Sequence, residues 1–290
     1  MSASEAIEKT IKAGKVLRQV KEEAIKLIKP GVKLLEVAEF VEGRIVELGA
    51  KPAFPCNISI NSDAAHFTPK KGDERVFKEG DLVKLDVGAH IDGYIADTAI
   101  SVDLGDHNDL VKASEEALKN AIDAIHAGID TAELGDVIES TIKEFGYKPI
   151  INLTGHGLQR WIAHAPPTIY NFSTKKGVVL EEGMIIAIEP FATNGVGKVV
   201  ERSEVEIFSL INPKPVRMKL AREMLEEIKQ YRTLPFAKRW LNRVSDFVIN
   251  KLVRDRVLRA YPVLTEVGKG LVSQAEHTVV VEEDGARIVT

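Results

Sequence analysis

Residues 31–52 read GVKLLEVAEFVEGRIVELGAKP, and residues 128–149 repeat them in altered form as GIDTAELGDVIESTIKEFGYKP. The two stretches lie 97 residues apart and are identical at eight of 22 positions, where ordinary residue usage would give about one or two matches. Two fused copies of one unit usually pack about a pseudo-twofold axis. Residues at matched positions are therefore expected to face each other. The identical pairs are Gly31/Gly128, Glu36/Glu133, Glu42/Glu139, Ile45/Ile142, Glu47/Glu144, Gly49/Gly146, Lys51/Lys148 and Pro52/Pro149.

The repeat continues downstream into acids and histidines. Ala65-His66 is matched by Ala163-His164, and the stretch EGDLVKLD at 79–86 is matched by EGMIIAIE at 182–189. The duplication therefore predicts that Asp86 lies near Glu189 and that His66 lies near His164.

The length and composition limit the class of protein. A chain of 290 residues is near the upper size for one hydrophobic core, which suits two repeated halves that share a sheet. Hydrophobic residues make up 44% and charged residues 28%, so a disordered chain is excluded, and a net charge of −4 gives no sign of a whole-chain nucleic-acid binder. We predict a single domain, 1–290, with pseudo-repeats at about 1–105 and 106–290.

Compartment signals point to the cytoplasm. The first 15 residues lack the apolar core of a signal peptide, and no apolar run approaches 18 residues. Cys56 is the only cysteine, which excludes an internal disulfide and a thiolate metal cluster. We therefore expect a cytoplasmic protein without a membrane partner.

Periodicity predicts two helices and then strands in each half. Apolar spacing of three and four residues predicts helices over 4–28, 34–48, 109–126 and 132–145. Period-two and apolar runs between turn residues predict strands over 81–87, 94–102, 184–191, 199–208 and 276–281. The expected fold is α/β (α+β), with an antiparallel sheet covered by two helix pairs.

Residues 214–262 have no counterpart in the first half. They are predicted to be a helical insert between two strands that would otherwise form a hairpin. The segment is basic, because Lys and Arg outnumber Asp and Glu. It is interpreted either as a solvated helical subdomain or as a contact surface for RNA or the ribosome.

Asp86 and Asp97 lie on successive predicted strands joined near Asp92-Gly93. A four-residue loop would place Asp86 opposite Asp97, and a two-residue loop would place it opposite Ala99. Either register puts both carboxylates on one face, because side chains alternate along a strand. Two like charges inside an apolar strand pair require neutralisation, which a divalent cation provides.

Two glutamates occupy the corresponding positions of the second half. Glu189 ends an apolar strand at the place that matches Asp86, and burial there is costly without a cation or a donor. Glu276 begins the strand after the insert, and the symmetry makes it the counterpart of Asp97.

Three of the seven histidines are candidates for chemistry. His66 and His164 are repeat partners, and His156 lies between Gly155 and Gly157, which allow close approach of a ligand. Imidazole is a common metal ligand and a good hydrogen-bond donor. The remaining histidines are interpreted as structural; they are His90, His107, His126 and His277.

Four carboxylates and one imidazole suit a site for two divalent cations. Oxygen ligands with one nitrogen favour Mn, Fe or Co, with Zn and Ni as further candidates. A pair of cations about 3.5–4 Å apart suits hydrolysis of an amide. Nucleophilic alternatives are weak, because no motif surrounds Cys56 and the chain has neither a Gly-x-Ser-x-Gly elbow nor a phosphate-binding loop.

The ordered set Asp86, Asp97, His156, Glu189 and Glu276 resembles the metal ligands of the methionine aminopeptidases, whose fold is the pseudo-symmetric pita-bread fold. The insert between Glu189 and Glu276 resembles the type II branch found in archaea and the eukaryotic cytosol. The local matches are Phe54-Pro55, Ala64-Ala65-His66-Phe67-Thr68-Pro69, Lys84-Leu85-Asp86-Val87-Gly88, Ala96-Asp97-Thr98-Ala99, Gly155-His156-Gly157 and Glu189-Pro190-Phe191-Ala192.

The resemblance implies removal of the initiator methionine by a metal-bridged hydroxide that attacks the first peptide carbonyl. Asp86 would bind one cation, His156 and Glu189 the other, and Asp97 and Glu276 would bridge them. Glu189 would also shuttle a proton to the leaving amine. The substrate would be held by His66 and His164, as hydrogen-bond donors to the intermediate or the substrate backbone, and by Phe54 and Ala163, as walls of the methionine pocket.

The resemblance also implies nascent polypeptide N-termini with a small second residue as substrates, and a monomer that binds no DNA. The ribosome is a candidate partner of the basic insert. Two other functions stay open at this point. One is an Xaa-Pro aminopeptidase or dipeptidase on the same fold, and the other is a non-catalytic protein that binds RNA or partners.

Overall fold

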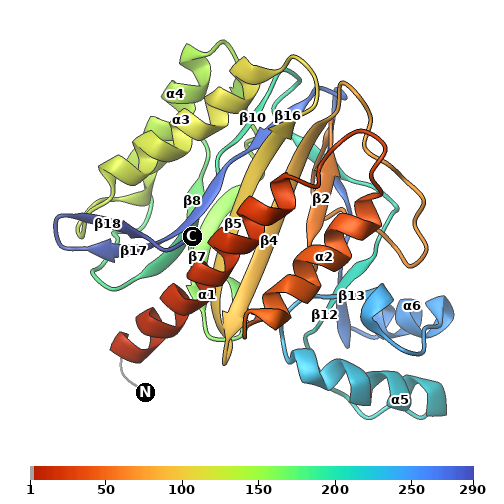
Figure 1. Ribbon diagram of the computed structural model, residues 1–290. Helices are drawn as coiled ribbons and strands as arrows, with labels where there is room; N and C mark the ends of the chain where they lie inside the picture. The colour runs from red at the N-terminus through yellow and green to blue at the C-terminus, as the bar shows by residue number, and fades with distance from the viewer. Residues whose placement is uncertain (1–2) are drawn as a thin grey trace.

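The structure of the protein, a computed structural model, describes residues 3–290. A curved antiparallel sheet forms its centre, and the helix pairs α1/α2 and α3/α4 lie over adjoining parts of it (Figure 1). The helices are α1 (Ala3–Ile25), α2 (Leu34–Glu47), α3 (Asn108–Ala124) and α4 (Thr131–Glu144).

The matched helices end at matched glycines. Gly49 after α2 and Gly146 after α4 have φ angles of 86° and 82°, a left-handed conformation that glycine adopts without steric cost. The starts differ, because Asp130 and Glu133 form a capping box on α4 whereas Lys33 gives α2 no side-chain cap. The four helices agree with the prediction within a few residues at each end.

The sheet repeats the duplication in its strand order. Its centre runs β4 (Leu82–Ile91), β5 (Tyr94–Asp103), β17 (Glu276–Glu282) and β9 (Ile185–Ile188). Next to β4 lies β2 (Asn57–Ile60), and next to β9 lies β7 (Thr154–Gln159). This order reads the same from either side, as a pseudo-twofold axis between β5 and β17 requires.

Further strands complete the fold. They are β1 (Lys51–Pro52), β3 (Asp63–Ala65), β6 (Lys148–Pro149), β8 (Ile162–Tyr170), β10 (Phe191–Thr193), β11 (Val199–Glu201), β12 (Ile207–Leu210), β15 (Leu264–Glu266), β16 (Val272–Gln274) and β18 (Gly285–Ile288).

Two predicted strands are wrong as continuous elements. The run 184–191 divides into β9 and β10 at residues 189 and 190, because Pro190 has no N–H to donate to a ladder. The run 199–208 divides into β11 and β12, because β11 pairs with β15 while β12 pairs with β13 (Phe236–Ala237) and β14 (Leu258–Tyr261).

Each half has its own hydrophobic cluster. The first joins α1, α2 and β4 through buried residues such as Leu17, Val41 and Leu85. The second joins α3, α4 and β9 through residues such as Leu118 and Ile186. The helices therefore pack against one face of the sheet. The opposite face of the central strands is left available for a functional site.

The insert is a mixed subdomain rather than the purely helical one that was predicted. Two helices, α5 (Lys219–Ile228) and α6 (Asp246–Arg254), and two 3-10 turns (Lys229–Tyr231 and Lys238–Trp240) are joined by strands β13 (Phe236–Ala237) and β14 (Leu258–Tyr261). The strands were missed because each is short and lies against β12, a partner outside the insert. The subdomain has its own apolar cluster, which includes Met224, Phe236 and Leu252. Within 3–290, no helix combines the length and apolarity that crossing a membrane requires.

Candidate active site

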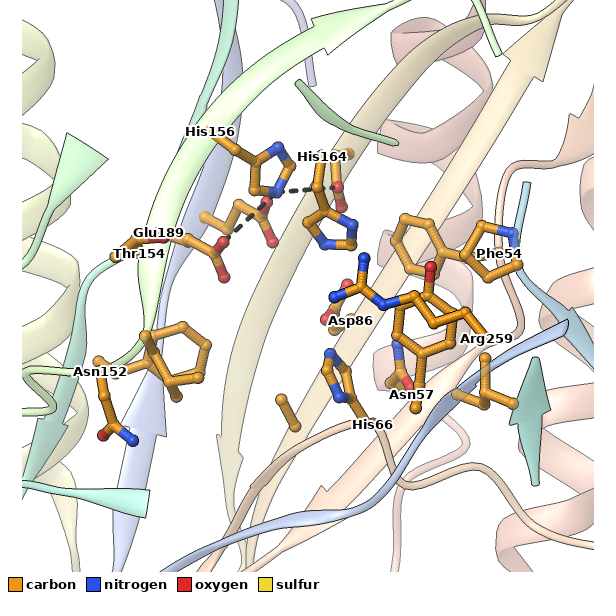
Figure 2. A pocket seen from close by; sticks show the side chains of 18 residues that line it. Phe54, Asn57, His66, Asp86, Asn152, Thr154, His156, His164, Glu189 and Arg259 are labelled. Atoms are coloured by element: carbon orange, nitrogen blue, oxygen red, sulfur yellow. Dashed lines mark ion pairs between the residues drawn. The ribbon is translucent and has the colours of Figure 1, made fainter. Parts of the chain in front are cut away.

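A cavity of about 350 Å³ opens beside the central strands. Its lining includes all of the predicted metal ligands and both predicted substrate histidines (Figure 2). The lining residues used below are Phe54, Asn57, His66, Asp86, Asp97, His156, His164, Glu189, Arg259, Tyr261 and Glu276.

The hairpin between β4 and β5 has the two-residue turn. Asp92 and Gly93 both have positive φ, at 52° and 87°, as the tight turns of hairpins require. Asp86 therefore lies opposite Ala99, and Asp97 lies opposite Gly88 on the diagonal. Of the two registers that the sequence left open, the structure has the second.

The carboxylates are aligned across adjacent strands. Ala99 of β5 lies opposite both Asp86 of β4 and Glu276 of β17. Side chain to backbone hydrogen bonds tie β5 to β17 at this point: Asp97 N–H donates to Thr278 Oγ1 at 2.8 Å, and Thr98 Oγ1 donates to the Glu276 carbonyl at 2.8 Å. The matched strands therefore deliver their acids to one place.

His156 joins the acids from β7. Its Nε2 lies 3.4 Å from Glu189 Oε1 and 3.9 Å from Asp97 Oδ2. Ligand atoms of Asp97, His156 and Glu276 all lie within 4.8 Å of one another. The His164 ring is 4.5 Å from that of His156, edge to face. The geometry thus brings both repeat pairs and the unmatched histidine into one cavity.

Burial controls the protonation of this cluster. It raises the pKa of Asp86 to about 7, and it raises the pKa values of Asp97, Glu189 and Glu276 well above the usual range, with further increases from the neighbouring carboxylates. Burial also lowers the pKa of His156 to about 3, and His164 adds to that effect. At neutral pH the acids therefore need protons or cations to stay together, and the imidazole is neutral.

The donor set fits divalent cations. Oδ1 of Asp86 and Oδ1 of Asp97 are buried and have no hydrogen-bond partner among the described residues, so both oxygens are free to be ligands. Oxygens that outnumber one neutral imidazole nitrogen match the preferences of Mn, Fe and Co.

His66 is held in an unusual backbone conformation. Its φ is 64°, which is uncommon for a residue other than glycine, and its ring lies edge-on to Tyr261 at 5.6 Å. Burial lowers its pKa to about 4, so it is neutral at pH 7. Nδ1 lies 3.3 Å from the Pro262 carbonyl, which can only accept. A hydrogen bond there requires the proton on Nδ1, and in that tautomer Nε2 is an acceptor.

The two predicted pocket walls differ in position. Phe54 lines the cavity, and its Cε1 atom would lie 2.2 Å from a Cβ at Gly88. Ala163 is buried in the same apolar cluster as Phe54 but is not among the residues that line the cavity. His90, His107, His126 and His277 do not line it either; for example, His90 accepts a hydrogen bond from the Gly93 N–H.

Sequence reasoning missed four residues around the cavity. Gln274 is buried, donates to Glu189 Oε2 at 3.4 Å and lowers the pKa of Asp86. Its position two residues before Glu276, on the same side of the chain, was an available signal. Asn57 lies opposite Asp86 and has a buried amide oxygen without a partner. Arg259 and Tyr261 come from β14, which was not predicted.

Comparisons with known proteins identify the family of the chain. A family model described as metallopeptidase family M24 matches residues 8–283. The chain is 67% identical over 287 residues to the methionine aminopeptidase of Archaeoglobus fulgidus, covering 99% of each chain. The solved methionine aminopeptidase of Thermotoga maritima is 27% identical, with a TM-score of 0.75 over 99% of this chain and 96% of that one.

A prolidase from Pyrococcus furiosus shares the fold at 24% identity and a TM-score of 0.64, but the match covers 64% of its length. The predicted pita-bread fold is confirmed by these structures and by the sheet order. Because the family model spans most of the sequence and the archaeal relative matches it from end to end, the chain belongs to metallopeptidase family M24, among the methionine aminopeptidases.

Proposed function

We propose that the buried acidic cluster holds two divalent cations with which this enzyme removes N-terminal methionine from peptides and nascent proteins. The observation that carries the proposal is the convergence of Asp86, Asp97, Glu189 and Glu276 with a neutral His156 in one cavity. Charges of one sign at this density require cations once the acids ionise.

Each ligand has a proposed place. Asp86, Asp97, Glu189 and Glu276 would hold the cations through carboxylate oxygens, and His156 would add one imidazole nitrogen. Co, Mn and Fe are the candidates that the oxygen-rich set favours, followed by Zn and Ni. When bound, such cations lower the pKa of water and polarise the peptide carbonyl.

The protein's own groups orient the substrate and move the proton. Glu189 accepts a proton from the attacking water and passes it to the leaving amine. His164 donates a hydrogen bond to the first carbonyl oxygen. His66 accepts one through Nε2 from the N–H of the peptide bond that is cleaved.

The cavity selects the N-terminal residue. Phe54 is the proposed wall for the methionine side chain, with Ala163 behind it in the same apolar cluster. A second residue with a small side chain is expected to react best, because it must pass between His66 and His164. We further propose that the enzyme acts as a cytoplasmic monomer and that exposed basic residues of the insert, such as Arg254 and Arg256, contact the ribosome.

Peptide hydrolysis tests the proposal. Metal-loaded protein is expected to release methionine from Met-Ala-Ser and to leave Ala-Pro intact, and a chelator should abolish the release. Asp97→Ala should lose both metal and activity, and His66→Ala should keep metal but lose rate. His107→Ala, outside the cavity, is the matched control. Cleavage of Ala-Pro alone would contradict the proposal and indicate an Xaa-Pro peptidase. Tight, salt-sensitive RNA binding without any turnover would indicate a non-catalytic RNA-binding protein.

A further inference from the structure

Arg259 brings a positive charge to the mouth of the cavity. It lies on β14, two residues before Tyr261, so both side chains project from the same face of the strand. Its guanidinium carbon lies 5.3 Å from the centre of the Tyr261 ring, and Tyr261 in turn lies edge-on to His66. In Figure 2 the guanidinium projects between His66 and His164, in front of Asp86.

This charge has no carboxylate partner within 3–290. Two other arginines of the insert do have a carboxylate partner: Arg239 pairs with Glu42, and Arg243 with Glu223 at 2.8 Å. The Arg259 side chain takes part in neither an ion pair nor a hydrogen bond among the described residues, and it is exposed. An exposed guanidinium that already packs on an aromatic ring is held in place without being neutralised.

Arg259 shares the lining of one cavity with both substrate histidines. A charged group bound beside His66 and His164 would therefore lie next to the guanidinium.

The path of a peptide through the site leads past Arg259. Under the proposed function, the N-terminal residue occupies the cavity and its carbonyl is bound beside His66 and His164. The remainder of the peptide then extends towards solvent, to which Arg259 of the cavity lining is exposed. The second residue is small, so the third residue has the first side chain long enough to meet the guanidinium.

We propose that Arg259 makes the enzyme charge-selective, so that substrates with Asp or Glu at the third residue are processed faster than substrates with Lys or Arg there. This inference rests on the proposed function and adds a specificity determinant to it. A guanidinium recognises a carboxylate by charge and by paired N–H donors, and it repels an ammonium group.

The test compares peptides that differ only at the third residue. Met-Ala-Glu-Ala-amide, Met-Ala-Gln-Ala-amide and Met-Ala-Lys-Ala-amide remove the terminal carboxylate as a competing anion. We expect kcat/KM to be about tenfold higher for the Glu than for the Lys peptide, which corresponds to about 1.4 kcal/mol. The ratio should fall as salt is raised from 0.02 to 0.5 M, because an exposed pair is screened.

Variants assign the preference to Arg259. The Glu/Lys ratio should approach one in Arg259→Gln, invert in Arg259→Glu and persist in Arg259→Lys. It should also persist in Arg254→Gln, which removes an exposed arginine of the same subdomain outside the cavity. Since the ratio is taken within one variant, a general loss of activity cancels.

A wild-type ratio near one, or a ratio that survives Arg259→Gln, would refute the inference even if no variant with inverted charge folds. Cleavage of the neutral Gln peptide distinguishes failure of the role of Arg259 from failure of the proposed function. If that peptide is cleaved without any charge preference, only the role of Arg259 is refuted. If metal-loaded protein cleaves none of the three peptides, the proposed function is refuted with it.

Discussion

Ser59 occupies in the first half of the sheet the place that His156 occupies in the second. Asn57 lies opposite Asp86 and Ser59 opposite Lys84 in the pairing of β2 with β4, whereas His156 lies opposite Ala187 in the pairing of β7 with β9. Since Asp86 corresponds to Glu189, the antiparallel register makes His156 the counterpart of Ser59. The Ser59 hydroxyl is buried and has no hydrogen-bond partner among the described residues. The near-symmetric site thus has a nitrogen ligand on one side only.

This asymmetry predicts different results for two matched substitutions. His156→Ala removes the one imidazole that, within residues 3–290, lies within 4.0 Å of both Glu189 and Asp97. Loss of a residue that only hydrogen-bonds to a metal ligand weakens metal binding by about 10–100-fold. Loss of His156, a proposed ligand itself, should weaken Mn²⁺ binding by at least as much. Ser59→Ala changes a buried side chain at the equivalent place and should leave the dissociation constant within about twofold. Isothermal titration calorimetry measures both, and equal losses would contradict the assignment of His156 as a ligand.

Metal removal should make stability depend on pH in a particular direction. A carboxyl group whose folded pKa is raised binds its proton more tightly in the folded state, so stability falls as pH rises from the unfolded pKa to the folded one. For Asp86 that range runs from about 4 to about 7. His66, His156 and His164 have folded pKa values lowered to about 4, 3 and 4, so they act oppositely, but only below about pH 6.5.

Between pH 6.5 and 8 the four carboxyl groups are opposed by the buried Lys84 and Lys21, whose pKa values are lowered to about 7 and about 8. The carboxyl groups are more numerous, so we expect their effect to be the larger one. The free energy of unfolding of the protein in EDTA should fall over this interval by an amount on the order of a few kcal/mol. The melting temperature should fall with it. Excess Mn²⁺ should reverse the fall, because a ligand that binds only the folded state stabilises it by about 2.7 kcal/mol at 100 times its dissociation constant. A melting temperature in EDTA that stays constant or rises from pH 6.5 to 8 would contradict the raised pKa values of the carboxyl groups.

The sequence predicted the halves of the fold better than the details that depend on distant partners. The repeat was sufficient to place the acids Asp86 and Glu189 together, since matched strands of a symmetric sheet share an environment. It could not decide the β4–β5 register, because a turn at Asp92-Gly93 and a longer loop both put the acids on one face. Likewise, β14 could not be predicted, because four residues form a strand only through their contact with β12.

Local sequence patterns and the internal symmetry decided which candidate site residues could be predicted. His156 was singled out by its glycine neighbours, and Glu276 by symmetry. Arg259 carries no local signal, since its role at the cavity arises from the return of the insert to the sheet. Gln274 was missed because an amide near an acid is ordinary in sequence. Its contact with Glu189 depends on how β16 packs.

Gly88 should control the shape of the methionine pocket. A Cβ at this position would lie 2.2 Å from Phe54 Cε1, so Gly88→Ala must displace the ring that lines the cavity. We expect kcat/KM for Met-Ala-Ser to fall by about tenfold or more, in keeping with the sensitivity of catalysis to small misplacements, while Mn²⁺ affinity is retained. Gly43→Ala, in open space on α2, is the control and should leave the kinetics unaltered. An equal loss of metal affinity in Gly88→Ala would instead place the damage at Asp97, its partner across the strands.

The ion pair between Glu42 and Arg239 should determine whether the insert stays attached to the sheet. The Arg239 side chain is only 4% exposed, and Glu42 also accepts from Trp240 Nε1 at 2.7 Å and from the Cys56 N–H at 3.0 Å. Glu42→Ala leaves a buried guanidinium without its carboxylate, although Arg239 keeps its hydrogen bonds to Thr68 and Pro69. The unbalanced buried charge should lower the free energy of unfolding by about 3–5 kcal/mol. Its repeat counterpart, Glu139, pairs with the exposed Lys143, so Glu139→Ala should cost about 1 kcal/mol or less. Urea unfolding compares the two, with limited proteolysis of residues 214–262 as a second readout. Equal costs would mean that Arg239 finds another partner or water when Glu42 is removed.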